Sequence, residues 1–253
     1  MNEWNDEAVI VRMGKFREAD VWIRMLCKNH GLQTVFAFGG LKSRRRFCGC
    51  LDLFNSLDCR VKICGKGSYL NLTEAVLMGG PRLLRMDWKK MGIAANCLRF
   101  LQMLTINSDS SQECFTLLEN LRFYLEQYKK PSPQFPFYFR LRLAVALGFG
   151  PELSTCGRCG SALRQTALFI GEEGRIFCNE CARLLSSSWQ RRGHWLNSSS
   201  LDFLRQVKLT LPQDWHDETL TYNERKCCAR AIAAFTQYHL ESGSGRNGSA
   251  TWQ

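Results

Sequence analysis

Apolar and polar residues alternate along the first third of the chain as they do in β-strands, and the rest follows a helical period. The segments richest in Val, Ile, Leu, Phe and Tyr are separated by turns that contain glycine. They span residues 7–13, 21–27, 32–39, 53–64 and 68–78. Five short strands at this spacing predict a small closed or partly closed β-barrel.

Helices are predicted from residue 82 onward. The first carries apolar residues at intervals of three and four, namely Leu84, Trp88, Met91, Ala95, Leu98 and Leu101. The sequence Ser110-x-x-Glu113 is a predicted capping box at the start of a second helix. Three prolines between residues 131 and 136 separate that helix from an apolar third helix over 137–147.

Two more helices are predicted near the C-terminus, one over 199–209 and one that opens with a capping box of Thr221 and Glu224. Residues 242–253 contain too little apolar surface to fold, so we expect them to be disordered. The predicted fold class is α+β, with an organisation of 1–80 (barrel), 81–150 (helices), 151–190 (cysteine module), 191–241 (helices) and 242–253 (tail).

Four of the thirteen cysteines form two C-x2-C pairs separated by 18 residues, and they are Cys156, Cys159, Cys178 and Cys181. Each pair lets two thiolates approach one ion, and two pairs complete a tetrahedral shell. Between the pairs, two apolar runs flank Glu172, Glu173 and Gly174, which predicts a β-hairpin that brings the pairs together. Because protein ligands fill all four positions, the predicted Zn²⁺ is structural and does not activate water.

Two alternatives remain for these four cysteines: a spacing that persists without metal, and a redox role. The redox role is disfavoured because the pairs flank one hairpin and no βαβ pattern surrounds them. The other nine cysteines are scattered, several within apolar patterns, and most are expected to pack as small apolar side chains. Cys48 and Cys50 form the remaining close pair, for which a metal or redox role is the minor alternative.

The formal net charge of +11 suggests an anionic partner, most commonly nucleic acid. Residues 1–80 carry +4 and residues 81–150 carry +5, whereas residues 151–253 carry +2. Two five-stranded barrels fit the strand pattern, the oligonucleotide-binding (OB) barrel and the SH3-like barrel. The basic content favours the OB barrel.

The densest positive charge lies in a predicted loop between two barrel strands and comprises Lys42, Arg44, Arg45 and Arg46. Cations in such a loop can pair with a phosphate backbone. The positive surface is predicted to continue along the next hairpin through Arg60, Lys62 and Lys66. A solvated surface without a ligand is the alternative for these charges.

Aromatic residues near this loop are candidates for base stacking, and they are Trp22, Phe36, Phe38 and Phe47. Alternation along the strands sends neighbouring side chains to opposite faces of a sheet. Most of these rings are therefore expected to be buried or half-buried.

Several classes of protein are disfavoured. No apolar run approaches the roughly 20 residues of a membrane-spanning helix, and the acidic start does not resemble a secretory signal, so we expect a cytoplasmic protein. Lys42 and Ser43 follow two glycines but lack the spacing of a nucleotide-hydrolysing loop. The four histidines are dispersed, and no catalytic residues or enzymatic activity are predicted.

These parts in this order resemble the RecO family of bacterial DNA-repair proteins, which are recombination mediators. The resemblance extends to about Leu240 and rests on segments 4–31, 42–54, 71–77, 145–160 and 178–181. The first of these, WNDEAVIVRMGKFREADVWIRMLCKNHG, combines an acidic pair, an apolar strand, a Glu-Ala-Asp turn and a His-Gly turn. Where the family has small residues around the basic loop, this chain has Phe47, Cys48 and Cys50.

The resemblance implies an N-terminal OB barrel, a helical domain and a zinc-bound module. It implies binding of single- and double-stranded DNA, annealing of complementary strands and help in loading recombinase onto protein-coated single strands. The implied partners are RecR and the single-stranded-DNA-binding protein, through its acidic tail. A nucleoid-associated location follows from the same resemblance. The implied zinc ligands are the four paired cysteines, and the implied DNA-facing residues are Lys42, Arg44, Arg45 and Arg46.

The residues alone leave two other functional classes open. One is an RNA- or ribosome-associated zinc protein with a similar barrel. The other is a nucleic-acid-modifying enzyme whose site carries no recognisable motif.

Overall fold

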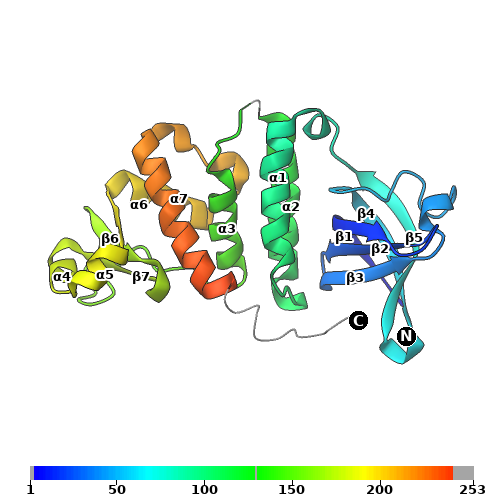
Figure 1. Ribbon diagram of the computed structural model, residues 1–253, viewed down its shortest axis with the longest axis horizontal. Helices are drawn as coiled ribbons and strands as arrows, with labels where there is room; N and C mark the ends of the chain where they lie inside the picture. The colour runs from blue at the N-terminus through cyan, green and yellow to red at the C-terminus, as the bar shows by residue number, and fades with distance from the viewer. Residues whose placement is uncertain (1–2, 129, 242–253) are drawn as a thin grey trace. The chain divides into compact units, whose positions relative to one another are not determined.

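The computed structural model describes residues 3–128 and 130–241, apart from the side chains of Lys66 and Glu241. It contains two compact units, Met1–Lys129 and Lys130–Gln253 (Figure 1). The tail for which we expect disorder, 242–253, lies outside the described residues. The finer domain boundaries remain predictions.

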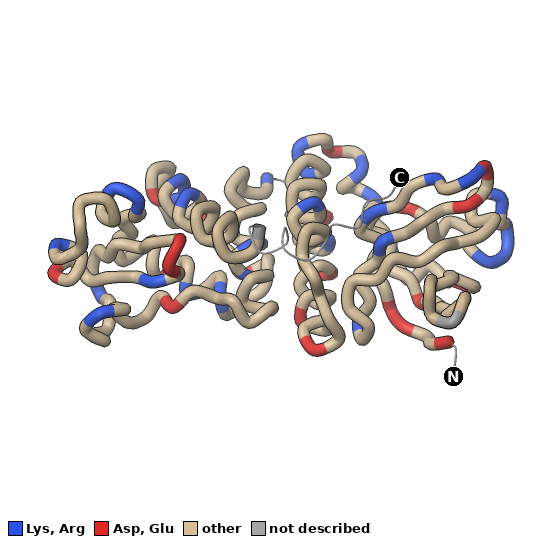
Figure 2. The backbone as a smooth tube through the Cα atoms, turned by 60° about the horizontal axis from the view of Figure 1, so that its bottom comes forward, with Lys and Arg blue, Asp and Glu red and all other residues tan. Residues whose placement is uncertain are grey.

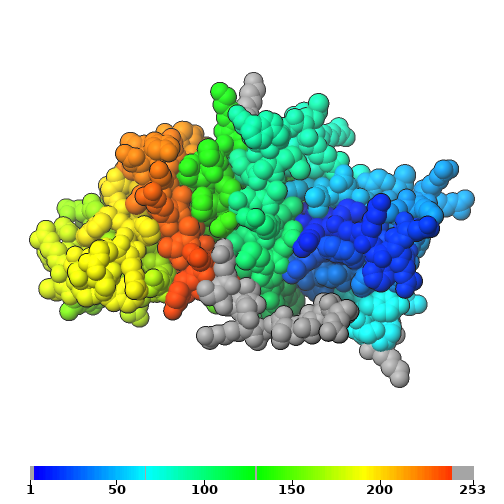
Figure 3. All heavy atoms as spheres, viewed as in Figure 1, coloured from blue at the N-terminus to red at the C-terminus, as the bar shows by residue number. Residues whose placement is uncertain are grey.

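The first unit begins with a closed barrel of five strands: β1 (Glu3–Lys15), β2 (Val21–Cys27), β3 (Gly31–Ala37), β4 (Ser56–Cys64) and β5 (Tyr69–Gly79). The strand order is β1-β2-β3-β5-β4, and β4 pairs back onto β1. In the space-filling view the strands form one compact body, coloured blue to cyan (Figure 3). The predicted OB-like barrel is confirmed.

Period-two alternation explains the barrel interior. One fully buried side chain from each strand illustrates it: Ile10, Ile23, Val35, Val61 and Leu72 are all 0 % exposed. Their neighbours along the strands face outward, because successive side chains of a strand point to opposite faces. The outer face of β2 and β3 is therefore free to carry polar and aromatic groups.

Two helices complete the first unit, α1 (Trp88–Gln102) and α2 (Ser108–Gln127). In Figure 1 they follow the barrel in green. The Gln102 side chain donates to the Val11 carbonyl at 2.7 Å, and the Gly31 amide donates to the Ser111 hydroxyl at 2.8 Å. Ser111 in turn donates to the Cys27 carbonyl. These bonds tie both helices to the barrel.

Gly31 makes this close approach possible. Its φ of 72° lies in the left-handed region, and a Cβ at this position would lie 2.1 Å from the Ile106 carbonyl oxygen. A residue with a side chain would have to push the α1–α2 connection away from the barrel.

Three details of the predicted helices are wrong. The first helix begins at Trp88 and not at residue 82, because the Asp87 carboxylate caps it by accepting from the Lys89 and Lys90 amides. Trp88 is 79 % exposed and does not face the core. The Ser110–Glu113 capping box is absent, because the N-cap of α2 is Asn107, three residues before Ser110.

The second unit contains the helices α3 (Phe135–Ala146), α6 (Ser198–Leu209) and α7 (Tyr222–Thr236). The capping box of Thr221 and Glu224 is confirmed at the start of α7. Asp217 is 7 % exposed and accepts from the Tyr138 hydroxyl at 3.0 Å, which satisfies a buried polar group between these helices.

A small sheet with strand order β7-β6-β8 lies in the same unit. Its strands are β6 (Ala167–Ile170), β7 (Arg175–Cys178) and β8 (His194–Leu196), and two short helices follow β7, α4 (Asn179–Arg183) and α5 (Ser187–Arg192). The predicted hairpin of β6 and β7 is confirmed, with Gly174 at φ 63° in its turn. The three-residue strand β8 has too short an apolar pattern to be recognised in advance. No helix in the described part of the chain is long and apolar enough to cross a membrane.

Candidate nucleic-acid interface and metal centre

The basic loop connects β3 to β4, and apolar side chains anchor it to the barrel. Phe47 and Cys50 are 3 % and 2 % exposed and belong to the barrel core. The Arg46 carbonyl accepts from the Ala75 amide of β5 at 3.0 Å, and the Asn55 side chain donates to the Gly49 and Cys50 carbonyls. The loop is therefore held at both its middle and its end.

Its cations face solvent. Lys42, Arg44, Arg45 and Arg46 are all exposed, and the loop projects from the molecular surface (Figure 3). Figure 2 shows Lys and Arg positions along the loops at this end of the barrel. Within the described residues, Lys42 has one acidic neighbour in ion-pair range, Glu18 at 3.8 Å. The positive charge of the loop is thus largely uncompensated.

Four aromatic rings gather beside this loop, on the outer side of the barrel. Phe36 and Phe38 come from the end of β3, Tyr69 opens β5, and Phe16 follows β1. Ring centroids of neighbours lie 5.3–6.3 Å apart, with Tyr69 edge-on to both Phe36 and Phe38. Phe16 is 50 % exposed and Tyr69 is 39 % exposed. We call these residues the four-ring cluster.

The loop and the four-ring cluster are joined directly. The Arg46 guanidinium donates to the Phe38 carbonyl at 2.7 Å. The same guanidinium lies over the Phe47 ring, with 4.9 Å to its centroid. The hydrogen bond to a backbone carbonyl therefore holds the flexible Arg46 side chain beside the cluster.

The aromatic candidates from the sequence divide into two groups. Trp22, Phe36 and Phe38 are half-buried on the outer face, where Trp22 pairs with Phe36 across β2 and β3. Phe47 is buried in the core, so it cannot stack on a base. Phe16 and Tyr69 were missed because they lie outside the strand interiors, and only the fold brings them to β3.

The three predicted DNA-binding cations on the β4–β5 hairpin differ in how far their charge is compensated. Arg60 is exposed but lies 3.7 Å from Glu74, so its charge is partly matched. Lys62 is exposed on the same strand. The side chain of Lys66 lies outside the described residues. Their assignment to the DNA-facing surface remains a prediction.

The four paired cysteines of the second unit converge on one point. Their sulfur atoms all lie within 4.8 Å of one another, and Cys159 Sγ is 3.9 Å from Cys178 Sγ. Tetrahedral Zn²⁺ with bonds of about 2.3 Å separates its sulfur ligands by roughly 3.8 Å. The donor set and its spacing fit a metal ion, and these four cysteines could hold one.

Local hydrogen bonds favour the thiolate form of the first cysteine pair, Cys156 and Cys159. The hairpin of β6 and β7 delivers Cys178, and the first turn of α4 delivers Cys181. Although burial raises the pKa of Cys156, backbone N–H groups of Cys159, Cys178 and Arg158 donate to its sulfur and lower the pKa to about 6. Hydrogen bonds from Ser161, first from its hydroxyl and then from its amide, lower the pKa of Cys159. Thiolates are the form that binds metal.

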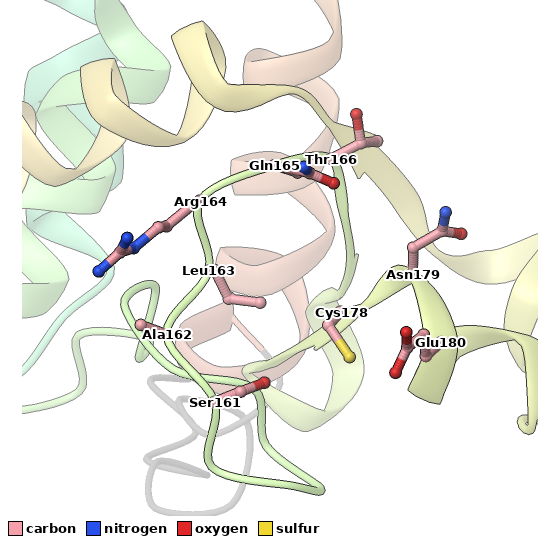
Figure 4. Close-up of a pocket in the computed structure, with 9 residues that line it drawn as sticks. All are labelled: Ser161, Ala162, Leu163, Arg164, Gln165, Thr166, Cys178, Asn179 and Glu180. Carbon is pink, nitrogen blue, oxygen red and sulfur yellow. The ribbon is translucent and has the colours of Figure 1, made fainter.

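A shallow pocket of about 350 Å³ borders the metal centre. Ser161 to Thr166 form one wall, and Cys178 to Glu180 form the other (Figure 4). Figure 4 shows the Cys178 side chain between Ser161 of one wall and Glu180 of the other. Of the four cysteines, Cys178 is the one that lines this pocket.

Family comparisons agree with this architecture. Residues 1–80 match the family model "Recombination protein O N terminal", and residues 85–246 match "Recombination protein O C terminal". The chain is 37% identical over 241 residues to "DNA repair protein RecO" of Lawsonia intracellularis, covering 94% of this chain and 95% of the relative. The protein of the same name from Nitratidesulfovibrio vulgaris (strain DP4) is 37% identical over 243 residues, with the same coverage.

A more distant relative of that name, from Thermodesulfovibrio yellowstonii, is 26% identical over 254 residues, covering 98% of this chain and 96% of the relative. The resemblance noted in the sequence is thus confirmed along both units. The chain belongs to the recombination protein O (RecO) family.

Proposed function

We propose that this protein is a non-enzymatic recombination mediator in DNA repair. It binds single- and double-stranded DNA, anneals complementary strands and assists recombinase loading on protein-coated single strands. Membership of the RecO family supports the DNA-repair part of the proposal, as do relatives named "DNA repair protein RecO".

One observation carries the DNA-binding part: the bond from Arg46 to the Phe38 carbonyl, which places the basic loop against the four-ring cluster. Cations beside exposed aromatic rings are the combination that binds single strands without sequence preference. The cations neutralise phosphates, and the rings stack on bases, each stacked base contributing roughly 1–3 kcal/mol.

Annealing follows from the same surface. Two complementary strands repel each other through their phosphates, and a cationic surface lowers that repulsion while leaving base edges free to pair. Arg44 and Arg45, which are exposed beyond the cluster, are suited to contact the second strand. Arg60, Lys62 and Lys66 extend this surface in the proposal.

The proposed partners are RecR and the acidic tail of the single-stranded-DNA-binding protein. The +5 charge of residues 81–150 is compatible with an acidic peptide. The proposed ion at the cysteine cluster is Zn²⁺, which stabilises the second unit and takes no part in chemistry. A cytoplasmic, nucleoid-associated location belongs to the same proposal.

The test is annealing of fluorescent complementary strands coated with single-stranded-DNA-binding protein, over a series of salt concentrations. Acceleration that fades with salt is the expected result. DNA binding without acceleration would contradict the mediator function. Tighter binding to RNA than to DNA of one sequence would favour the RNA-associated alternative, and altered DNA after incubation would favour a modifying enzyme.

Replacing Tyr69 with Ala should weaken binding of a short single strand by about 1–3 kcal/mol, because one stacking ring is lost. Because Tyr69 is edge-on to Phe36 and Phe38, the free energy of unfolding should also fall by roughly 1–3 kcal/mol, so affinity is compared under conditions in which both variants are folded. Fluorescence anisotropy measures the affinity. Tyr222→Ala, at a 63 % exposed tyrosine of α7, is the matched control and should bind as the wild type does. Equal affinities of the two variants would remove the cluster from the binding surface.

A further inference from the structure

A cavity of about 550 Å³ lies at one end of the outer face of β2 and β3. The barrel contributes Arg24, His30, Leu32 and Gln33 to its lining, and residues 104–108 of the α1–α2 connection form the opposite wall. All of these residues belong to the first compact unit. Its lining is cationic and polar on the barrel side.

Arg24 faces a second arginine across the sheet. In the β1–β2 register Arg12 is the partner of Arg24, and like charges directly opposite each other destabilise a sheet. Among the described residues neither guanidinium forms an ion pair with a carboxylate, although Arg12 lies over the Trp22 ring at 5.4 Å. Burial and then the Arg12 charge lower the pKa of Arg24. An anion at this place would relieve the repulsion.

Contacts with Asp6 and Trp4 fix the orientation of the His30 ring and leave its Nε2 for a ligand. Its Nδ1 lies 2.7 Å from Asp6 Oδ2, and its ring stacks on Trp4 with centroids 4.0 Å apart. The Asp6 carboxylate also accepts from the Asn29 amide and side chain, which disperses its charge. With Nδ1 engaged, the Nε2 of His30 is the nitrogen available at the cavity.

The opposite wall closes the end of the outer face. The Leu32 amide donates to the Ile106 carbonyl at 3.0 Å, which fixes the connection against the β2–β3 hairpin. Ser108, the first residue of α2, adds a hydroxyl to the lining. Asp109, the acidic residue of this helix turn, does not line the cavity. The α1–α2 connection therefore borders the outer face at this end.

The cavity is aligned with the four-ring cluster along the strands. Trp22 pairs with Phe36 of the cluster, and two residues further along β2 and β3 Arg24 pairs with Thr34. Two residues of a strand span about 7 Å. The cations of the cavity are thus one step beyond the aromatic surface on the same face.

We propose that this cavity binds the terminal phosphate of a DNA strand whose neighbouring bases lie on the four-ring cluster. The inference rests on the proposed DNA binding and adds a preference for strand ends that carry a phosphate. A phosphate monoester has about −1.5 to −2 charges at pH 7, more than the single charge of a phosphodiester. Arg24, with Arg12 nearby, matches this larger charge, His30 Nε2 and the Ser108 hydroxyl add polar contacts, and residues 104–108 border the site at its far end.

The experiment compares three oligonucleotides of one sequence with an internal fluorophore. One has hydroxyl groups at both ends, one a 5′-phosphate and one a 3′-phosphate, and anisotropy measures the affinity of the full chain for each. We expect one of the phosphorylated forms to bind about tenfold more tightly than the hydroxyl form. Arg24→Gln should abolish this ratio, because Gln keeps part of the stem but removes the charge.

Two further variants test whether the preference for a terminal phosphate comes from the cavity or from the overall positive charge of the surface. Arg17→Gln removes a cation that lies over the Phe16 ring, outside the cavity, and should weaken all three oligonucleotides equally. Ser108→Asp places a negative charge at the cavity while suiting a helix N-terminus, so it should abolish the ratio without unfolding α2.

The outcomes distinguish this inference from the proposed function. Equal affinity of the wild type for all three oligonucleotides would overturn the end-binding cavity and leave DNA binding intact. A ratio that persists in Arg24→Gln and Ser108→Asp would place the end preference elsewhere and would also overturn it. Absence of binding to every oligonucleotide would overturn both.

Discussion

Replacing Cys178 with Ser is expected to release about one equivalent of metal and to unfold the second compact unit. Cys178 supplies one of four convergent sulfurs, and three remaining ligands hold a structural ion much more weakly. Binding of structural Zn²⁺ contributes roughly 10–16 kcal/mol in small peptides at neutral pH, so loss of a ligand should cost more than about 4 kcal/mol.

Elemental analysis of the purified protein and thermal unfolding with and without a chelator measure these effects. Cys48→Ser is the matched control, because Cys48 is an exposed cysteine of the other unit. It should retain both metal and stability. A wild-type protein that contains no metal and unfolds normally would refute the metal centre, and a chelator without effect on unfolding would refute its structural role.

Replacing Lys42, Arg44, Arg45 and Arg46 together with Ala is expected to reduce the salt dependence of DNA binding. Each phosphate contact contributes about 0.7 to the slope of log affinity against log salt for a single strand. Loss of up to four contacts should therefore lower the slope by as much as about 3. Affinity at low salt should fall by orders of magnitude, independently of sequence.

The control for this variant keeps the charge. Replacing Arg44, Arg45 and Arg46 with Lys retains four cations, so the slope should stay close to that of the wild type. Affinities measured by anisotropy between about 50 and 200 mM salt provide both slopes. If the alanine variant has the slope of the wild type, the loop does not contact DNA.

The barrel and the cysteine cluster were predictable because local signals determine them. Alternation and glycine turns mark all five strands, and β2 begins and ends at the predicted residues 21 and 27. The spacing of the two cysteine pairs, with a hairpin between them, specifies four sulfurs around one point without knowledge of the rest of the fold. Thr221 and Glu224 form a capping box for the same local reason.

Other features depend on contacts between distant residues. Trp88 fits the helical period of its segment. It is nevertheless the first residue of α1, directly after the Asp87 cap, and its ring is exposed to solvent. Phe47 lies in a polar loop and nevertheless packs in the barrel core, because the loop returns to β5, where the Arg46 carbonyl accepts from the Ala75 amide. No local pattern contains this information.

The proposed binding surface also combines features that local sequence determines with features that depend on distant contacts. Its charge is visible in the run from Lys42 to Arg46, whereas its aromatic part combines Phe16 and Tyr69 with β3 only after the barrel closes. The Arg12–Arg24 pair likewise requires the β1–β2 register, which shifts by one residue between Ile10 and Arg12. A bulge of this kind is not readable from alternation alone.

Ser111 couples local unfolding of the β2–β3 turn to that of the first turn of α2. It accepts from the Gly31 amide and donates to the Cys27 carbonyl. One hydroxyl of α2 therefore satisfies two backbone groups of the β2–β3 turn. Separation of α2 from the barrel would break both bonds at once and expose the Gly31 amide. A ligand on the outer face of β2 and β3 should slow deuterium uptake at the start of α2, even though that helix turn lies beyond the four-ring cluster.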